Sequence, residues 1–170
     1  MRLFISIYFD DETKEKILEV QQRLKKLGRG RFTASDNLHL TLAFLGEVGE
    51  ERVPGLQALM DGIKVPEMQL VFSETGAFRG GSELWWIGIR QNELLSTLQS
   101  ELVKKLKASG FKVDSKKFKP HITLAREMHI GHAERGELLT KAFSCTASHM
   151  LLMMSHRPGG KLTYTELYRK

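Results

Sequence analysis

The stretches His39-Leu40-Thr41-Leu42 and His121-Ile122-Thr123-Leu124 decide the fold, because one short pattern occurs twice in a chain of 170 residues. In a β-strand, residues i and i+2 lie on one face, and residues i+1 and i+3 lie on the other. Each tetrapeptide therefore predicts a strand that turns a histidine and a threonine toward a cleft and two apolar residues toward the core.

The repeat extends well beyond these tetrapeptides. The two histidines are 82 residues apart (121 − 39), and an ungapped shift by 82 aligns residues 2–44 with residues 84–126. Ten of the 43 aligned positions are identical, where typical residue frequencies give roughly two or three by chance. We interpret the register as an internal duplication with a pseudo-twofold axis, which predicts that the two His strands meet in one site.

Local patterns give both halves the same order of elements. We predict strands at residues 2–9 and 84–90, each followed by a helix that ends at a glycine, Gly28 or Gly110. Asp10 or Asp11 and, in the second half, Asn92 are suited to cap these helices. A basic loop then leads to each His strand. We also predict a helix at residues 50–63, strands at 68–75, 143–155 and 162–167, and turns at 79–82 and 157–160.

This order of elements is typical of the α+β class. We expect a duplicated bilobal fold in which two antiparallel or mixed sheets form a central groove, with helices on the outer faces. A chain of 170 residues with 41% hydrophobic residues can bury one ordinary core. No flexible linker separates the halves, so residues 1–170 are expected to be a single domain built from two pseudo-symmetric lobes.

Composition restricts location and partners. The chain contains no run of about 18 apolar residues, as a membrane helix would need, and its first strand runs directly into acidic residues without a signal-peptide cleavage region. We expect a cytoplasmic protein with no membrane contact, and the lone Cys145 suits a reducing compartment. The net charge of +6 favours polyanionic partners. Cations precede both His strands and form either an electropositive entrance or solvated loops: Arg23, Lys25, Lys26, Arg29 and Arg31, then Lys112, Lys116, Lys117 and Lys119.

The paired motifs suit phosphodiester cleavage without a metal. A neutral imidazole can take a proton from the attacking oxygen while a protonated imidazole gives one to the leaving oxygen, and a pKa near 6.5 allows both states. The hydroxyls of Thr41 and Thr123 can donate hydrogen bonds to phosphate oxygens. The residues alone do not assign the acid and the base, because the two halves are nearly symmetric.

Other histidines are weaker candidates. His129 and His132 have a spacing that can hold a metal, but with no cysteine or carboxylate set nearby we interpret them as solvated. His149 and His156 are expected to be structural or to lie at a rim. No cofactor or metal is predicted.

The chain resembles the two-histidine (2H) phosphoesterase superfamily, and within it the bacterial and archaeal RNA 2′,3′-cyclic phosphodiesterases, also described as 2′-5′ RNA ligases. The resemblance is carried by residues 2–7 (RLFISI), 36–46 (DNLHLTLAFLG), 120–126 (PHITLAR) and 164–167 (YTEL). It implies hydrolysis of a terminal 2′,3′-cyclic phosphate on RNA to a 2′-phosphate, and ATP-independent ligation as a reverse-type reaction. It also implies RNA ends or related nucleotides as ligands, with no obligate protein partner.

Residue roles follow from the same resemblance. His39 would be the proton donor and His121 the proton acceptor, with Thr41, Thr123 and Arg126 as substrate contacts. Strand alternation argues against Arg126, because it is three residues after Thr123 and would point away from the groove unless the strand ends there.

Two alternatives are kept. A metal-dependent hydrolase could use the two histidines as ligands but would need further ligands that the motif does not supply. A non-catalytic module that binds RNA ends or nucleotides would use the same groove without turnover.

Overall fold

The two His-x-Thr motifs begin strands β3 (His39–Glu47) and β6 (His121–Ile130), which lie in different sheets. The structure is a computed structural model that describes residues 1–114, 116–130 and 138–170. The first sheet has the order β3-β1-β8-β9, with β1 (Arg2–Tyr8), β8 (Leu151–His156) and β9 (Thr163–Arg169). The second sheet has the order β2-β6-β5-β4-β7, with β2 (Gly28–Phe32), β5 (Glu83–Ile89), β4 (Met68–Phe78) and β7 (Phe143–Ala147).

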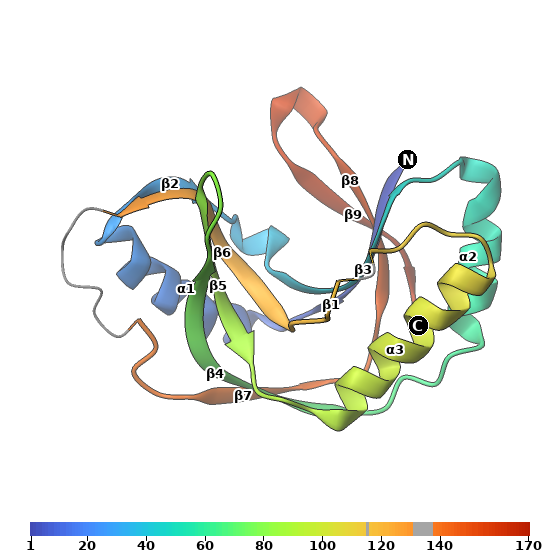
Figure 1. Cartoon of the computed structure of the whole chain (residues 1–170), viewed down its shortest axis with the longest axis horizontal. Coiled ribbons are helices and arrows are strands. Elements are labelled where there is room, and N and C mark those ends of the chain that lie inside the picture. Colours follow the sequence, from blue (N-terminus) through green and yellow to red (C-terminus); the bar gives the residue numbers. More distant parts are fainter. Residues whose placement is uncertain (115, 131–137) are drawn as a thin grey trace.

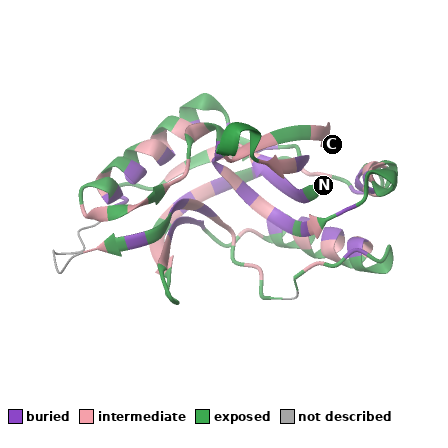
Figure 2. Cartoon of the chain, turned by 90° about the horizontal axis from the view of Figure 1, so that it is seen from above, coloured by how far each residue is buried: buried purple, intermediate pink, exposed green. Residues whose placement is uncertain are grey.

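Every strand pair in these two sheets is antiparallel, which fits the predicted α+β class. Figure 1 shows helix α1 (Asp11–Lys25) on one flank and helices α2 (Val53–Asp61) and α3 (Glu93–Ala108) on the other, with the strands between them. Short 3₁₀ turns lie at Ser35–Asn37, Glu50–Arg52 and Pro158–Gly160. Buried residues gather on the strands and on the inner sides of the helices (Figure 2).

The order of strands and helices repeats along the chain as the 82-residue register predicts. The order β1, α1, β3 is repeated as β5, α3, β6, and both helices begin at the predicted caps. The Asp10 carboxylate accepts a hydrogen bond from the backbone N–H of Thr13 at 2.8 Å, and the Asn92 side chain accepts one from Leu95 at 3.0 Å. These bonds satisfy N–H groups that a helix start leaves without partners.

The two sequence halves exchange elements in forming the lobes. Strand β4 of the first half joins the second sheet, and β8 of the second half joins the first sheet. The helices cross over as well. Gln21 of α1 donates a hydrogen bond to the carbonyl of Leu124 in β6 at 2.9 Å, and Gln99 of α3 donates one to the carbonyl of Leu42 in β3 at 3.2 Å. Leu42 and Leu124 are equivalent in the 82-residue register, so the exchange is symmetric.

One hydrophobic cluster joins both sheets and the three helices. Its fully buried members include Ile5 and Leu40 from the first sheet, Ile122 from the second, Ile17 from α1 and Leu102 from α3. Among the described residues, none of the helices combines the length and apolar character needed to cross a membrane.

Two sequence predictions are wrong in detail. Residues 143–155 form two strands of different sheets, β7 and β8, because the chain leaves the second sheet after Ala147 and Met150 pairs with Lys170 beside β9 through two 2.9 Å backbone hydrogen bonds. Helix α1 ends at Lys25, and Gly28 starts β2 in place of a cap. A side chain at Gly28 would collide with the backbone carbonyl of His129, so this glycine permits the close approach of β2 to β6.

Candidate active site

Strands β3 and β6 contact each other where the two sheets meet, and a groove of about 930 Å³ lies beside this contact. All five residues that the sequence nominated line this one groove: His39, Thr41, His121, Thr123 and Arg126. The intervening Leu40 and Leu42 are buried, as strand alternation predicts. The duplication therefore places both His-Thr pairs on the walls of a shared cavity.

The strand-alternation argument against Arg126 is wrong, because β6 contains a bulge. Trp85 of β5 pairs with Ala125, whereas its neighbour Trp86 pairs with Thr123, so Leu124 is an extra residue. A bulge of this kind shifts the alternation beyond it by one residue. Leu124 and Ala125 are both fully buried in succession, and the Arg126 side chain returns to the groove.

Strand β3 has a bulge at the equivalent place. Ile5 pairs with Ala43 and Ser6 pairs with Thr41, which leaves Leu42 as the extra residue. Phe44 consequently returns to the groove, at the position that the 82-residue register aligns with Arg126. The two halves thus present an aromatic ring and a guanidinium at equivalent points of the same cavity.

Both groove histidines are held in the same tautomer. His39 Nδ1 lies 2.7 Å from the carbonyl oxygen of Asn37, and His121 Nδ1 lies 2.6 Å from the carbonyl oxygen of Lys119. A carbonyl can only accept, so each Nδ1 carries hydrogen and donates it. Each Nε2 is then the atom that gains or loses a proton. His39 Nε2 lies 2.9 Å from the hydroxyl of Thr41, which donates to it when the ring is neutral.

Aromatic rings fix the orientation of His39. Tyr8 stacks on its imidazole with centroids 5.6 Å apart and planes at 16°. Phe4 and Tyr164 contact the same imidazole at 4.9 and 5.2 Å. The sequence analysis did not identify these residues as part of the site. Phe4 and Tyr8 nevertheless lie on one face of β1, the strand that pairs with β3.

The surroundings of His121 are similar in kind. Phe78 contacts its ring edge-to-face at 5.0 Å, and Trp86 contacts it at 6.4 Å. The Lys119 ammonium lies 4.0 Å from the centre of the Trp86 ring, a cation–π contact that holds it beside the site. The 82-residue register aligns Trp86 with Phe4. The repeat in the sequence therefore relates the aromatic residue beside His121 to the one beside His39.

Burial and positive charge lower the pKa of both histidines. Desolvation is the largest cause for His39 and lowers its pKa from 6.5 to about 4, although the Asn37 carbonyl favours the charged form. Arg126 and His121 oppose protonation further. Desolvation also lowers the pKa of His121, with Arg126 and Lys119 acting in the same direction. In the unliganded protein near neutrality, both Nε2 atoms are therefore free of hydrogen.

The groove is electropositive. Five cationic residues line it against one carboxylate, that of Glu47: Arg2, Arg31, Arg126, Arg157 and Lys161. Arg157 and Lys161 flank the turn of the β8–β9 hairpin, which projects from the body of the molecule in Figure 1. Of the cations predicted before the His strands, only Arg31 lines this groove. Arg23 instead donates a hydrogen bond to the carbonyl of Leu138, and Lys25 lies over Phe32.

The remaining histidines lie elsewhere or at the edge. His129 and His149 are exposed, His132 lies outside the described residues, and His156 lines the groove with its Nε2 2.8 Å from the Thr165 hydroxyl. Within residues 1–114, 116–130 and 138–170, no group of three or more His, Cys, Asp or Glu side chains is placed to hold a metal ion.

A known protein family matches this chain in two segments, one in each half of the duplication. The family described as LigT like Phosphoesterase matches residues 7–85 and 87–160, so each matched segment contains one His-x-Thr motif. An RNA 2′,3′-cyclic phosphodiesterase of Escherichia coli is 37% identical over 131 residues, which cover 74% of this chain and 72% of that protein. One from Archaeoglobus fulgidus is 34% identical over 128 residues, covering 74% and 72%.

Solved structures agree in fold. The crystal structure of E. coli LigT in apo form superposes with a TM-score of 0.84 at 31% identity, covering 99% of this chain and 95% of that one. The same protein complexed with 3′-AMP gives a TM-score of 0.84 with 99% and 96% coverage. The similarity in sequence and in fold extends over both lobes, and this chain belongs to the LigT-like phosphoesterase family.

Proposed function

We propose that this protein is an RNA 2′,3′-cyclic phosphodiesterase that opens a terminal cyclic phosphate to a 2′-phosphate by metal-independent acid–base catalysis. The names of its relatives and the family match support the activity. The observation that supports the mechanism is the matched pair of imidazoles, each with Nδ1 bound to a carbonyl and Nε2 left to exchange a proton in one electropositive groove.

In the proposed reaction, water attacks phosphorus in line with the 3′ oxygen. His121 Nε2 accepts a proton from the water, the bond between phosphorus and the 3′ oxygen breaks, and protonated His39 Nε2 gives its proton to that oxygen. The products are a 2′-phosphate and a 3′-hydroxyl. Solvent then removes the proton from His121 and restores one to His39. The 5′-hydroxyl of a second RNA in place of water would form a 2′–5′ linkage by the same step.

The low pKa of His39 fits a proton donor that is charged only when substrate is bound. A phosphodiester anion in the groove favours the imidazolium and raises its pKa from the value of about 4 in the free protein. An imidazolium with a depressed pKa gives up its proton readily. Arg126, Thr41 and Thr123 line the same groove, which supports their proposed roles. In the proposal, Arg126 balances charge on the phosphate and the two hydroxyls donate hydrogen bonds to the non-bridging oxygens.

The proposed ligands are RNA ends with a 2′,3′-cyclic phosphate and related nucleotides. E. coli LigT has been crystallised with 3′-AMP, NADP⁺ and ATP, which supports a nucleotide-binding groove in this relative. We further infer that residues 1–170 act as a single domain, because one hydrophobic cluster includes residues of both sheets. RNA substrates and the unpaired Cys145 favour a cytoplasmic location.

The test is incubation with a short RNA that ends in a 2′,3′-cyclic phosphate, with the 2′- and 3′-phosphate products separated. We expect only 2′-phosphate, at a rate that EDTA leaves unchanged. His39→Ala and His121→Ala should each reduce kcat by about 10²–10⁴-fold while circular dichroism stays native, and His149→Ala, at an exposed site outside the groove, serves as the matched control.

Three outcomes contradict the proposal. Near-normal turnover by either groove variant would exclude the two-histidine mechanism. Activity that EDTA abolishes and a divalent ion restores would indicate a metal-dependent hydrolase. Binding of the RNA end without product at any pH would indicate a non-catalytic binding module.

A further inference from the structure

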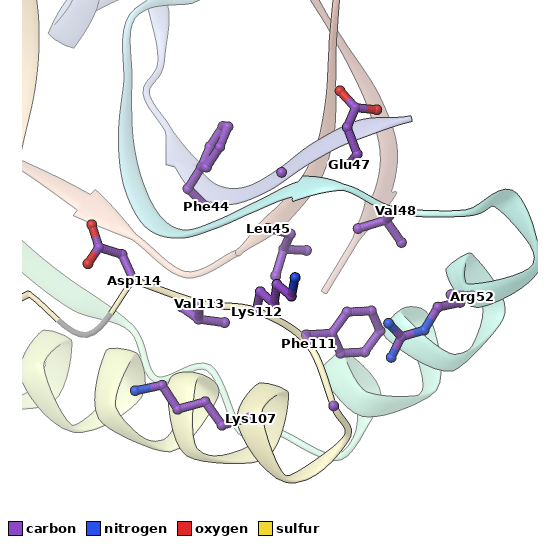
Figure 3. A pocket seen from close by; sticks show the side chains of 12 residues that line it. Phe44, Leu45, Glu47, Val48, Arg52, Lys107, Phe111, Lys112, Val113 and Asp114 are labelled. Atoms are coloured by element: carbon purple, nitrogen blue, oxygen red, sulfur yellow. The ribbon is translucent and has the colours of Figure 1, made fainter.

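A second cleft of about 830 Å³ lies on the far side of the edge strand β3 from the catalytic groove. Figure 3 shows it between the end of β3, the last turn of α3 and the segment that follows that helix. Leu45 and Val48 point into it from β3, while Phe111 faces it from the opposite side. Its size is within the range of about 300–1,000 Å³ that is common for ligand sites.

The cleft exists because the duplication is incomplete at this point. The 82-residue register aligns β2 with residues 110–114, and β2 pairs with β6 at the edge of the second sheet. Residues 110–114 form no strand, and among the described residues no backbone hydrogen bond joins them to β3. Gly110 has a φ of +74°, and Phe111 donates its backbone N–H to Leu106 at the end of α3. The chain is therefore directed along the helix end and away from the β3 edge.

Among the described residues, the two lysines of this cleft make no ion pair, whereas both of its carboxylates do. Glu47 lies 3.6 Å from the α-amino group of Met1, and Asp114 accepts a hydrogen bond from the backbone of Lys116 and lies 3.8 Å from its ammonium. Within the part of the chain that the structure describes, Lys107 and Lys112 make no ion pair.

Arg52 adds a third cation in a fixed position. Its guanidinium stacks 3.8 Å from the centre of the Phe111 ring and donates a hydrogen bond to the carbonyl of Ser109 at 2.9 Å. Figure 3 shows this stacked pair at one end of the cleft and Lys107 along α3 beneath Val113. Three cations thus line the cleft, and none of them forms an ion pair with a carboxylate of the residues that the structure describes.

The second cleft shares part of its wall with the catalytic groove. Phe44 and Glu47 line both cavities. Phe44 is 43% exposed, which is unusual for a phenylalanine, and the Arg2 guanidinium lies 5.1 Å from its ring. An exposed aromatic ring flanked by cations is the arrangement on which bases of a single strand stack. Phe44 therefore lies on the wall that the catalytic groove and the cationic cleft share.

We propose that the second cleft binds the body of a single-stranded RNA whose cyclic-phosphate end occupies the catalytic groove. One base stacks on Phe44, and upstream phosphates contact Lys107, Lys112 and Arg52. This proposal rests on the proposed function and specifies its substrate as an oligonucleotide. An extended peptide could instead pair with the open edge of β3, but the unpaired cations and the shared wall with the groove favour RNA.

The test compares a nucleoside 2′,3′-cyclic phosphate with an oligoribonucleotide of about eight residues that has the same terminal group. The measured quantity is the ratio of kcat/KM for the oligomer to kcat/KM for the mononucleotide. The double variant Lys107→Gln/Lys112→Gln should lower this ratio by about tenfold. The slope of log kcat/KM against log salt concentration for the oligomer should become shallower by about 1.4, since each single-strand phosphate contact contributes about 0.7.

Lys104→Gln is the matched control, because Lys104 is an exposed lysine of α3 that does not line the cleft, and it should leave both ratio and slope unchanged. Phe44→Ala should lower the ratio without the change in salt slope. A ratio and slope in the double variant equal to those of the unmodified protein would overturn the second-cleft proposal. Failure of the unmodified protein to hydrolyse both the mononucleotide and the oligomer would instead overturn the proposed function.

Discussion

Acidification should destabilise this protein through His39 at a pH where carboxylates remain charged. The folded structure holds the pKa of His39 near 4 because the ring is desolvated, against 6.5 for an unperturbed histidine. Between these two values the unfolded chain binds more protons than the folded one, so stability falls as pH falls. The lowered pKa of His121 acts in the same direction.

The magnitude follows from these two pKa values. Proton linkage with 6.5 in the unfolded chain and about 4 in the folded chain removes about 2 kcal/mol of unfolding free energy between pH 7 and pH 5. Total stabilities of domains are about 5–15 kcal/mol, so the effect is large enough to measure. His39→Gln removes the titrating group, and its stability should therefore change by about 2 kcal/mol less over the same interval.

The assay is urea unfolding at pH 7, 6 and 5, followed by fluorescence of the buried Trp85 and Trp86 and by circular dichroism. His149→Gln controls for the loss of an exposed imidazole outside the groove. Parallel stability curves for the unmodified protein and His39→Gln would refute the assignment of a desolvated, neutral His39. The same assignment would be refuted if His149→Gln reduced the pH dependence of stability as much as His39→Gln does.

Further predictions concern the groove and the sheets. The pH optimum of kcat/KM should lie below 6.5, because both groove histidines have lowered pKa values in the free protein. The optimum of kcat should lie at higher pH. A kcat/KM that rises from pH 6.5 to pH 8 would contradict this prediction. Gly76→Ala should lower the free energy of unfolding by about 1–3 kcal/mol and reduce turnover, because an added Cβ collides with the Trp86 ring. Gly80→Ala is the control in urea melts and rate assays, because the space around Gly80 is open. Gln21→Leu should cost about 2 kcal/mol, because it removes the two hydrogen bonds that the Gln21 amide donates to the carbonyls of Thr33 and Leu124. The exposed Gln22→Leu should have little effect in the same melts.

Local sequence patterns were sufficient for much of the fold. The caps at Asp10 and Asn92, the buried faces of α1 and α3, and the alternation that buries Leu40 depend on neighbours three or fewer residues away or on a regular helical period. The 82-residue register added a long-range relation, because equivalent segments of a duplication fold alike. The sequence was therefore sufficient to assign both His-Thr pairs to one groove.

Details of the site depend on pairing between distant strands. Whether Arg126 faces the groove is decided by a bulge, and the bulge is defined only by how β6 pairs with β5. The division of residues 143–155 into β7 and β8 has a similar origin, since each strand finds its partner in a different sheet. No pattern within these residues specifies which distant edge is available.

The sequence by itself determined the repeated His-Thr strands, their caps and their apolar faces, because these follow from side-chain alternation and from contacts within one helical turn. Only the tertiary structure decided the exchange of strands between lobes, the aromatic surroundings of His39 and the second cleft beside β3. The physical reason is that burial, desolvation and strand pairing depend on which distant segments pack together. The lowered histidine pKa values and the position of β3 at the edge of its sheet are consequences of that packing.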